Sequence, residues 1–309
     1  MSKDTPPLFA PPLFNRVAFI GIGLIGSSLA RVMRRDRLAG HITVTARTQA
    51  TLDKVVELDL ADHVTADPVE AVTDADLIMI CTPLGAYAAV ARSIGAHLKP
   101  GAIVSDVGSA KKCVFRDLAP HLADGVHLVP GHPVAGTEHS GPEAGFAELF
   151  KDRFCILTPT AGTDADAVAR ITALWRAAGM KVEAMDADHH DQVLAITSHL
   201  PHLIAYTIVD TAAQLGDDLQ QEIFKYSASG FRDFTRIAAS DPVMWRDIFV
   251  ENKDAVLDIL GRFDEDLTTL KRAIRQGDGQ TLEDVFTRTR AVRREIIDAK
   301  QHTPEDQKS

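Results

Sequence analysis

The residue of this sequence best suited to acid–base chemistry is His132. It lies in the stretch 129–138 (VPGHPVAGTE), which is rich in glycine and proline. Imidazole changes its charge near neutral pH, so a histidine held on a stiff polar loop is well placed to take up a proton. We therefore expect a loop, rather than a regular helix or strand, to carry His132. The alternative is a tight turn with an incidental histidine.

Three further residues could bind an anion or a hydroxyl group. Arg232 and Arg236 are four residues apart, so in a helix they would share one face. A guanidinium binds a carboxylate through two parallel N–H bonds, which makes this pair a candidate anion clamp. The alternative for Arg232 is a surface pair with Asp233. Ser109 follows a predicted strand, and its hydroxyl either reaches a substrate or caps the next helix.

A dinucleotide-binding turn is predicted near the N-terminus. The apolar run 16–20 is typical of a buried parallel strand, and it leads directly into GIGLIG at 21–26 and then into a helical pattern. The first glycine allows the turn, the second lets backbone approach a pyrophosphate, and the third lets helix pack on strand. The N–H groups at the helix start would bind the phosphates. The expected cofactor contacts here are Gly21, Gly23, Leu24, Ile25 and Gly26.

The second predicted strand, 42–45, indicates which dinucleotide is bound. An NAD-selective site usually has an acid after this strand to bind the ribose 2′-hydroxyl, but Ala46 stands there. Arg47 and Thr48 instead offer a guanidinium and a hydroxyl, which suit a 2′-phosphate. We expect NADP, with NAD as the alternative. A solvated Arg47 on a surface loop is the competing interpretation.

Strand-like and helix-like segments continue to alternate through residue 185. This pattern predicts an α/β, Rossmann-like, doubly wound parallel sheet. Thr82 and Pro83 close the strand 77–81 at the carboxyl edge, where cofactors lie in such sheets, so both are expected to contact the cofactor. The other predicted elements are strands 102–105, 126–129, 154–157 and 182–184, and helices 27–35, 85–98 and 163–179.

From residue 186 the strand signals stop and an all-α domain is predicted. A helix is expected from 188, and the stretch 198–202 lies either within it or at a break of it, because Pro201 lacks the N–H of a helical hydrogen bond. His189 and His190 are expected in its solvated first turn. His199 and His202 are three residues apart, but no HExxH motif accompanies them, so we predict no metal site.

Two long apolar stripes follow in this helical region. One helix is predicted from an N-cap at Asp241, with Pro242 in its first turn, to Gly277, and a last helix from a capping pair of Thr281 and Asp284. Stripes this long in a small domain suggest packing on a second copy, so we expect a homodimer through these helices. The predicted domains are 1–185, with 1–14 disordered, and 186–300, with a disordered tail at 301–309.

Composition limits the remaining possibilities. The chain has 309 residues, which suits two domains, and a net charge of −10, which argues against nucleic acid as a partner. The sequence contains no run of about 18 apolar residues, so no membrane span is predicted. Three widely spaced cysteines fit reduced thiols, and the N-terminus lacks a signal-peptide pattern, so we expect a cytoplasmic protein.

Several motifs occur in an order that resembles the TyrA family of prephenate, arogenate and cyclohexadienyl dehydrogenases. The resemblance runs from about residue 16 to about residue 299, and its most specific parts are the segments around His132 and Arg236. It implies oxidative decarboxylation in tyrosine biosynthesis, giving 4-hydroxyphenylpyruvate from prephenate or tyrosine from arogenate. The motifs are GIGLIGSSLA at 21–30, DVGS at 106–109, GHPVAGTE at 131–138, HLPH at 199–202 and FRDFTR at 231–236.

The same resemblance implies roles for individual residues. His132 would take the proton of the ring hydroxyl as hydride leaves the same carbon, and Ser109 would orient that hydroxyl. Arg236 would bind a substrate carboxylate, whereas the role of Arg232 stays open. Any tyrosine inhibition would act at the active site, because no regulatory domain follows the helices. The implied pocket residues are His202, Ser198, Thr137 and, in a stretch lent by the partner subunit, Gly230.

Two other functions fit part of the sequence. A 3-hydroxyacid or imine-type reductase with the same two-domain plan would need a catalytic lysine in the first long helix after the sheet, but residues 186–221 contain none. A dinucleotide-sensing protein without turnover would need neither a histidine on a rigid loop nor an arginine pair downstream.

Overall fold

The computed structural model describes residues 11–215, 225–226 and 228–298. The chain divides into two compact units between Val256 and Leu257. Disorder is predicted for residues 1–14 and 301–309, of which 1–10 and 301–309 lie outside the described residues. The prediction is wrong for Phe14, which is wholly buried and begins a β-strand.

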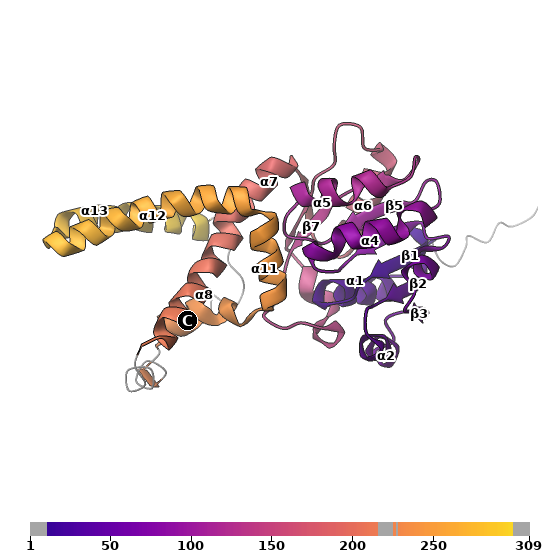
Figure 1. Cartoon of the computed structure of the whole chain (residues 1–309), viewed down its shortest axis with the longest axis horizontal. Helices are drawn as coiled ribbons and strands as arrows, with labels where there is room; N and C mark the ends of the chain where they lie inside the picture. The colour runs from indigo at the N-terminus through magenta and orange to yellow at the C-terminus, as the bar shows by residue number, and fades with distance from the viewer. Residues whose placement is uncertain (1–10, 216–224, 227, 299–309) are drawn as a thin grey trace, which may run out of the picture. The chain divides into compact units, whose positions relative to one another are not determined.

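The first unit is built on a six-stranded parallel sheet with the order β3-β2-β1-β4-β5-β6 (Figure 1). This order confirms the predicted doubly wound, Rossmann-like fold. β1 begins two residues earlier than predicted because Phe14 is wholly buried and its N–H pairs with the carbonyl of Leu38. The strands are β1 (Phe14–Ile20), β2 (Ala39–Thr45), β3 (His63–Thr65), β4 (Leu77–Ile80), β5 (Ile103–Asp106) and β6 (His127–Leu128).

Helices cover both faces of this sheet. In β1, Val17 and Phe19 pack in one apolar cluster with residues of α1 and α6, whereas Ala18 and Ile20 pack in another with residues of α4 and α5. Burial on both faces explains why the strand is apolar throughout. The helices are α1 (Leu24–Arg35), α2 (Gln49–Glu57), α3 (Pro68–Val72), α4 (Tyr87–Ile94), α5 (Lys112–Asp117) and α6 (Ala165–Ala177). Short helical turns are η1 (Leu84–Ala86), η2 (Gly95–His97), η3 (Ala119–His121), η4 (Pro142–Ala144) and η5 (Ala147–Phe150).

A second, three-stranded sheet carries His132. β7 (Gly131–Val134) runs antiparallel to β8 (Phe154–Leu157), which is parallel to β9 (Lys181–Ala184). The expectation that His132 lies on a loop is therefore wrong. β7 is at the edge of its sheet, where Pro133 is tolerated because an outward-facing N–H is not needed for the ladder.

The helical part of this unit begins with α7 (Ala187–Leu194), a π-helical turn (Ala195–His199) and α8 (Leu200–Ala213). The π turn ends two residues before Pro201, and the helical stretch Ala187–Ala213 continues through this proline, so it lies within the helix and not at a break. α10 (Ser229–Thr235) and η7 (Arg236–Ala239) precede α11 (Pro242–Glu251), whose first turn is capped by Asp241 as predicted. α11 packs on the parallel sheet, because Trp245 and Ile248 join the cluster around Tyr87.

By length and composition, the helical stretch Ala187–Ala213 would also be able to cross a membrane. Its first half is instead part of the protein interior, since His190, Asp191 and His199 are wholly or almost wholly buried and hydrogen-bonded within the unit. In its second half Ile208 and Val209 are each 37% exposed. We therefore explain this stretch as a core helix with a partly apolar outer face.

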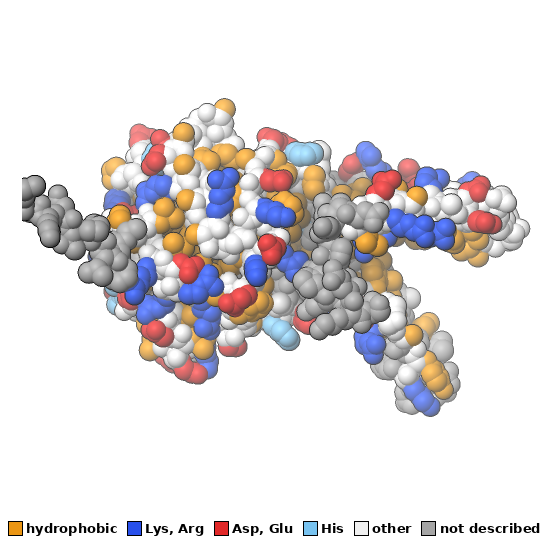
Figure 2. All heavy atoms as spheres, turned by 180° about the vertical axis from the view of Figure 1, so that it is seen from behind, with side chains coloured by type: hydrophobic (Ala, Val, Ile, Leu, Met, Phe, Trp, Pro, Cys, Tyr) orange, Lys and Arg blue, Asp and Glu red, His pale blue; other side chains and the backbone are white. Residues whose placement is uncertain are grey.

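The second unit contains the larger part of α12 (Lys253–Gln276), together with α13 (Gly279–Asp298). The prediction of one long helix from Pro242 to Gly277 is wrong, because the chain turns at Asn252 between α11 and α12. Asp278, rather than Thr281, caps the last helix, since Thr281 donates to it from both N and Oγ1. Basic, acidic and apolar side chains are mixed on the visible face of these helices (Figure 2), and Leu257, Leu267, Ile274, Phe286 and Val292 are exposed.

Candidate active site

The glycine-rich turn has the shape that a dinucleotide needs. Gly21 has φ +78°, and a Cβ built on it would lie 2.9 Å from Cγ2 of Thr82. A Cβ on Gly26 would lie 3.2 Å from Cys81, so this glycine lets α1 pack closely on the end of β4. Gly23 faces open space, and no side chain caps the N-terminus of α1. The free N–H groups at Leu24 and Ile25 and the open glycine therefore fit a pyrophosphate.

The residues predicted to select the cofactor lie at the start of α2. Arg47 and Thr48 are both exposed. The Thr48 hydroxyl is the N-cap of α2 and accepts the N–H of Thr51 at 3.3 Å. Thr82 and Pro83 follow β4 as predicted, and the buried Thr82 hydroxyl has no hydrogen-bond partner among the described residues.

A buried ion pair fixes β7 against the carboxyl end of β5. Nζ of Lys111 donates to Oδ2 of Asp106 at 2.6 Å and to the carbonyl of Gly131 at 2.7 Å. Asp106 also accepts from the Tyr87 hydroxyl at 2.9 Å, and from the backbone N–H groups of Gly108 at 2.8 Å and Gly131 at 3.2 Å. Both charges are wholly buried, so each needs these partners. The network places His132, the next residue of β7, at the carboxyl edge of the parallel sheet.

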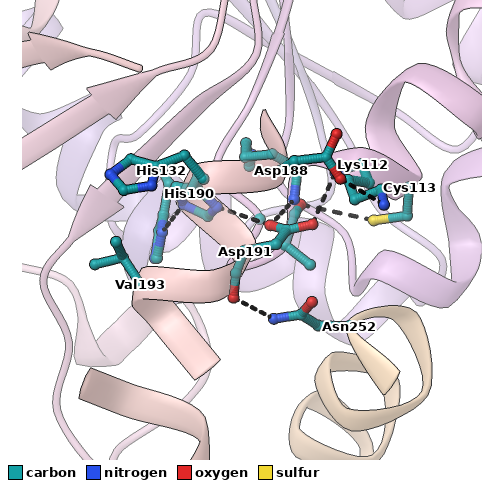
Figure 3. Close-up of polar contacts among 12 residues, drawn as sticks. Lys112, Cys113, His132, Asp188, His190, Asp191, Val193 and Asn252 are labelled. Atoms are coloured by element: carbon teal, nitrogen blue, oxygen red, sulfur yellow. Dashed lines mark hydrogen bonds and ion pairs between the residues drawn. The ribbon is translucent and has the colours of Figure 1, made fainter. Parts of the chain in front are cut away.

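A chain of hydrogen bonds runs from His132 into α7. Nδ1 of His132 lies 2.9 Å from Nε2 of His190, and Nδ1 of His190 lies 2.8 Å from Oδ1 of Asp191. Figure 3 shows His190 between His132 and Asp191. His132 is 6% exposed, His190 0% and Asp191 1%. The prediction of a solvated His190 is wrong, because the first turn of α7 packs this ring against β7. His189, one residue earlier, is exposed.

Asp191 also caps α5. Its Oδ1 accepts the N–H of Lys111 at 2.7 Å and its Oδ2 accepts the N–H of Lys112 at 3.0 Å. The alternative that Ser109 caps this helix is therefore wrong: no side chain of the preceding turn caps α5, and a carboxylate 79 residues further along the chain does so.

The environment keeps these histidines neutral and Asp191 charged. Burial, together with repulsion from His190 and Lys111, holds the pKa of His132 well below its usual value of 6.5. Burial also lowers the pKa of His190, although its hydrogen bond to Asp191 opposes this. Burial alone would raise the pKa of Asp191, but hydrogen bonds from His190 and from two backbone N–H groups outweigh it and lower that pKa.

A second cluster of rings lies beside Ser109. Asn252 Nδ2 donates to the carbonyl of Asp191 at 2.9 Å and to Nδ1 of His199 at 3.1 Å. Burial lowers the pKa of His199 to about 4, and the backbone of Ser109 faces its ring. Ser109 itself is half-buried, and no hydrogen bond joins it to His132 in the described part of the chain.

His202 extends this cluster. Its ring stacks on Trp245 with centroids 3.7 Å apart, and its Nδ1 donates to the carbonyl of Ser198 at 2.8 Å. Two buried N–H donors, Nε2 of His199 and Nε1 of Trp245, have no acceptor among the described residues. Buried donors of this kind are suited to oxygen atoms of a ligand.

The remaining predicted residues lie at the surface. Nη1 of Arg236 donates to Oε2 of Glu138 at 3.1 Å, so this pair joins η7 to the segment after β7. Arg232 is exposed, and its Nε lies 3.9 Å from Oδ1 of Asp233, which agrees with the alternative of a surface pair. Thr137 accepts the N–H of His139, and Gly230 is exposed on α10. The described contacts do not connect Thr137, Gly230 or Arg232 with His132.

Several residues of this site cannot be recognised from the sequence. The sequence predicts a solvated turn for His190 and no site role for Asp191, Asp106, Lys111 or Asn252. Their only local signal is an ionisable side chain within an apolar helical or strand pattern. That signal does not identify partners 25 to 80 residues away. Where the structure describes the chain, no group of three or more metal-ligating side chains is present.

A parallel sheet with an open glycine turn and a buried neutral histidine at the same edge is the arrangement of a dinucleotide-dependent dehydrogenase. Family models agree with this class. Residues 29–184 match the nucleotide-binding domain of prephenate dehydrogenase, and residues 186–288 match its dimerization domain. The chain belongs to the prephenate dehydrogenase family and is an NAD(P)-dependent dehydrogenase of the prephenate and arogenate type, acting in tyrosine biosynthesis.

Individual relatives support this assignment. A cyclohexadienyl dehydrogenase of Zymomonas mobilis is 42% identical over 281 residues, which cover 91% of this chain and 96% of that protein. The crystal structure of Aquifex aeolicus prephenate dehydrogenase in complex with hydroxyphenyl propionate and NAD+ has a TM-score of 0.84 at 34% identity and covers 94% of this chain and 100% of that one. Synechocystis arogenate dehydrogenase has a TM-score of 0.74 at 29% identity, covering 91% and 99%.

Proposed function

We propose that His132 is the general base of this dehydrogenase and that its substrate is prephenate, arogenate or both. The observation that carries the proposal is a buried histidine, neutral at pH 7, held by a hydrogen bond at the carboxyl edge of the sheet. Oxidation of an alcohol needs a base for the hydroxyl proton, and neutral imidazole suits that task. The bound nicotinamide would supply the hydride acceptor. Loss of CO2 then makes the ring aromatic, which drives the reaction.

The other site residues would bind and orient the substrate. Ser109 orients the hydroxyl toward His132, and Arg236 binds a carboxylate in exchange for its contact with Glu138. His202, Ser198 and Thr137 line the pocket, and Gly230 is contributed by the partner subunit. The two unpaired donors on His199 and Trp245 support an oxygen-rich ligand beside them.

We propose NADP as the preferred cofactor. Ala46 leaves no carboxylate to bind the ribose 2′-hydroxyl, and the exposed Arg47 stands next to the N-terminus of α2. A 2′-phosphate there would meet a guanidinium and a helix N-terminus. The Aquifex aeolicus relative was crystallised with NAD+, so NAD remains the alternative to be measured. Arg47→Ala should weaken NADP more than NAD, and an equal loss would contradict the 2′-phosphate contact.

We also propose a homodimer formed through the C-terminal helices, within the cytoplasm. The match to a dimerization domain supports the dimer, and so do the exposed apolar residues Leu257, Ile274 and Phe286. Three free cysteines suit a reducing compartment.

One assay tests the activity. The purified protein is mixed with prephenate or arogenate and with NAD or NADP, and the absorbance of the reduced nicotinamide is followed. We expect turnover with at least one substrate, and faster turnover with NADP. No absorbance rise in any of the four combinations would overturn the proposed reaction, and the ratio of kcat/KM values between the two substrates gives the preference.

A further inference from the structure

We propose that His190 and Asp191 are positioning residues for His132: they decide which ring nitrogen of His132 carries its proton. The inference rests on the proposed role of His132 as base. It concerns a hydrogen-bond chain that joins β7, α7 and the first turn of α5 (Figure 3).

The direction of each hydrogen bond follows from its partners, starting at α5. The backbone N–H groups of Lys111 and Lys112 can only donate, so both oxygens of Asp191 are acceptors there. A carboxylate that only accepts requires Nδ1 of His190, 2.8 Å away, to carry the hydrogen. A neutral His190 then has an unprotonated Nε2. Because that atom lies 2.9 Å from Nδ1 of His132, the hydrogen between the two rings belongs to His132.

This order leaves Nε2 of His132 as the nitrogen with a free lone pair. Only that tautomer can take a proton at Nε2, since the opposite one would present an N–H there. The rings are buried, so water does not compete for these bonds. When His132 accepts a proton and becomes an imidazolium, His190 continues to accept from Nδ1, and the Asp191 carboxylate stabilises the positive charge through it.

The first test uses the protein without cofactor or substrate. Histidine ring nitrogens are labelled with 15N and their NMR shifts report which nitrogen is protonated; signals lost in His132→Asn identify His132 among the 12 histidines. We expect Nδ1 of His132 to be protonated and Nε2 to be unprotonated. Finding the proton on Nε2 in the unaltered protein would overturn the inference without any further variant.

The second test changes His190. His190→Phe keeps a planar ring and removes both hydrogen bonds, so the fixed Nδ1–H signal should be lost. His190→Gln can place its amide oxygen near the position of Nε2, and should restore part of the signal. His189→Phe makes the same substitution one residue earlier at an exposed position, and it should change neither signal nor rate.

Kinetics then separate positioning from structure. We expect His190→Phe to lower kcat about 100-fold with little change in KM, because proper general-base catalysis is worth about 100-fold or more and substrate binding is untouched. His190→Gln should lie between this variant and the unaltered protein. A His190→Phe variant that keeps both the Nδ1–H signal and kcat would overturn the inference. If the unaltered protein oxidises neither substrate, the proposed function fails, while the NMR result still decides the tautomer.

Discussion

The glycine turn and the histidine chain are two halves of one site that are encoded in different ways. Every residue of the turn comes from one short stretch, 21–26, which Thr45, Cys81 and Thr82 approach from elsewhere in the chain. The histidine chain takes its members from β7, α7 and the start of α5, which are up to 80 residues apart. The glycine turn depends on the shape of the local backbone. The histidine chain depends on buried polar side chains that form hydrogen bonds with one another.

The difference predicts that single substitutions in the assembled half cause large, specific losses, starting with His132. His132→Asn removes the base but adds no bulk, so kcat should fall by about 10²–10⁴-fold. Cofactor affinity should stay almost unchanged, because the glycine turn does not depend on His132. Both quantities are measured with the same preparation, by steady-state kinetics and by dinucleotide titration. A parallel loss of cofactor affinity would show that His132 is structural.

The buried ion pair should dominate stability. Lys111→Met leaves the Asp106 carboxylate buried without its cation, which should lower the free energy of unfolding by about 3–5 kcal/mol. Lys99→Met breaks a lysine–aspartate pair of the same length that is partly exposed, and should cost about 1 kcal/mol or less. Urea unfolding of both variants measures the contrast. Equal losses would show that burial of the Asp106 pair carries no special energy.

Acid should lower the folding stability of this protein through the buried histidines of the site. The folded-state pKa of His199 is about 4, below its usual 6.5, so the unfolded chain binds the proton first as pH falls. Stability present above pH 6.5 is therefore lost as pH falls toward 4, and at about 1.4 kcal/mol per pKa unit this loss is about 3 kcal/mol.

His199→Asn tests that acid sensitivity. It keeps an acceptor for Asn252 but does not titrate, so its unfolding free energy should depend less on pH between 6.5 and 4. The quantity compared is the slope of the unfolding free energy against pH. A loss of stability that is the same at every pH leaves this slope unchanged. Parallel curves for the variant and the unaltered protein would place the acid sensitivity in other groups.

The smallest expected effect concerns Arg236. Its surface pair with Glu138 contributes little by itself, but a charge-assisted contact with a substrate carboxylate is worth about 1.5–3 kcal/mol, so Arg236→Ala should raise KM about 10- to 100-fold. Arg232→Ala, on the same short helical segment, is the matched control and should leave KM nearly unchanged. The two variants would exchange these outcomes if Arg232 were the anion clamp.

The sequence by itself determined the parts of this protein that depend on short-range rules. The alternation of strands and helices and the GIGLIG turn follow from local periodicity and from the backbone freedom of glycine. The structure has the turn where predicted, whereas the predicted strands 154–157 and 182–184 belong to the second sheet and not to the parallel one. The Asp241 cap is equally local. The motifs around His132 and Arg236 likewise indicated the family that the comparisons show.

Only the tertiary structure decided how His132 is held. The edge strand that contains it exists because β8 pairs with it, and the burial of His190 depends on how α7 packs against that strand. Asp191 caps a helix about 80 residues earlier in the sequence, which no periodicity reports. A buried polar side chain is stable only beside its partners, and those partners meet only when the chain has folded. The sequence identifies His132 as a candidate site residue, whereas the fold determines its hydrogen bonds and its burial.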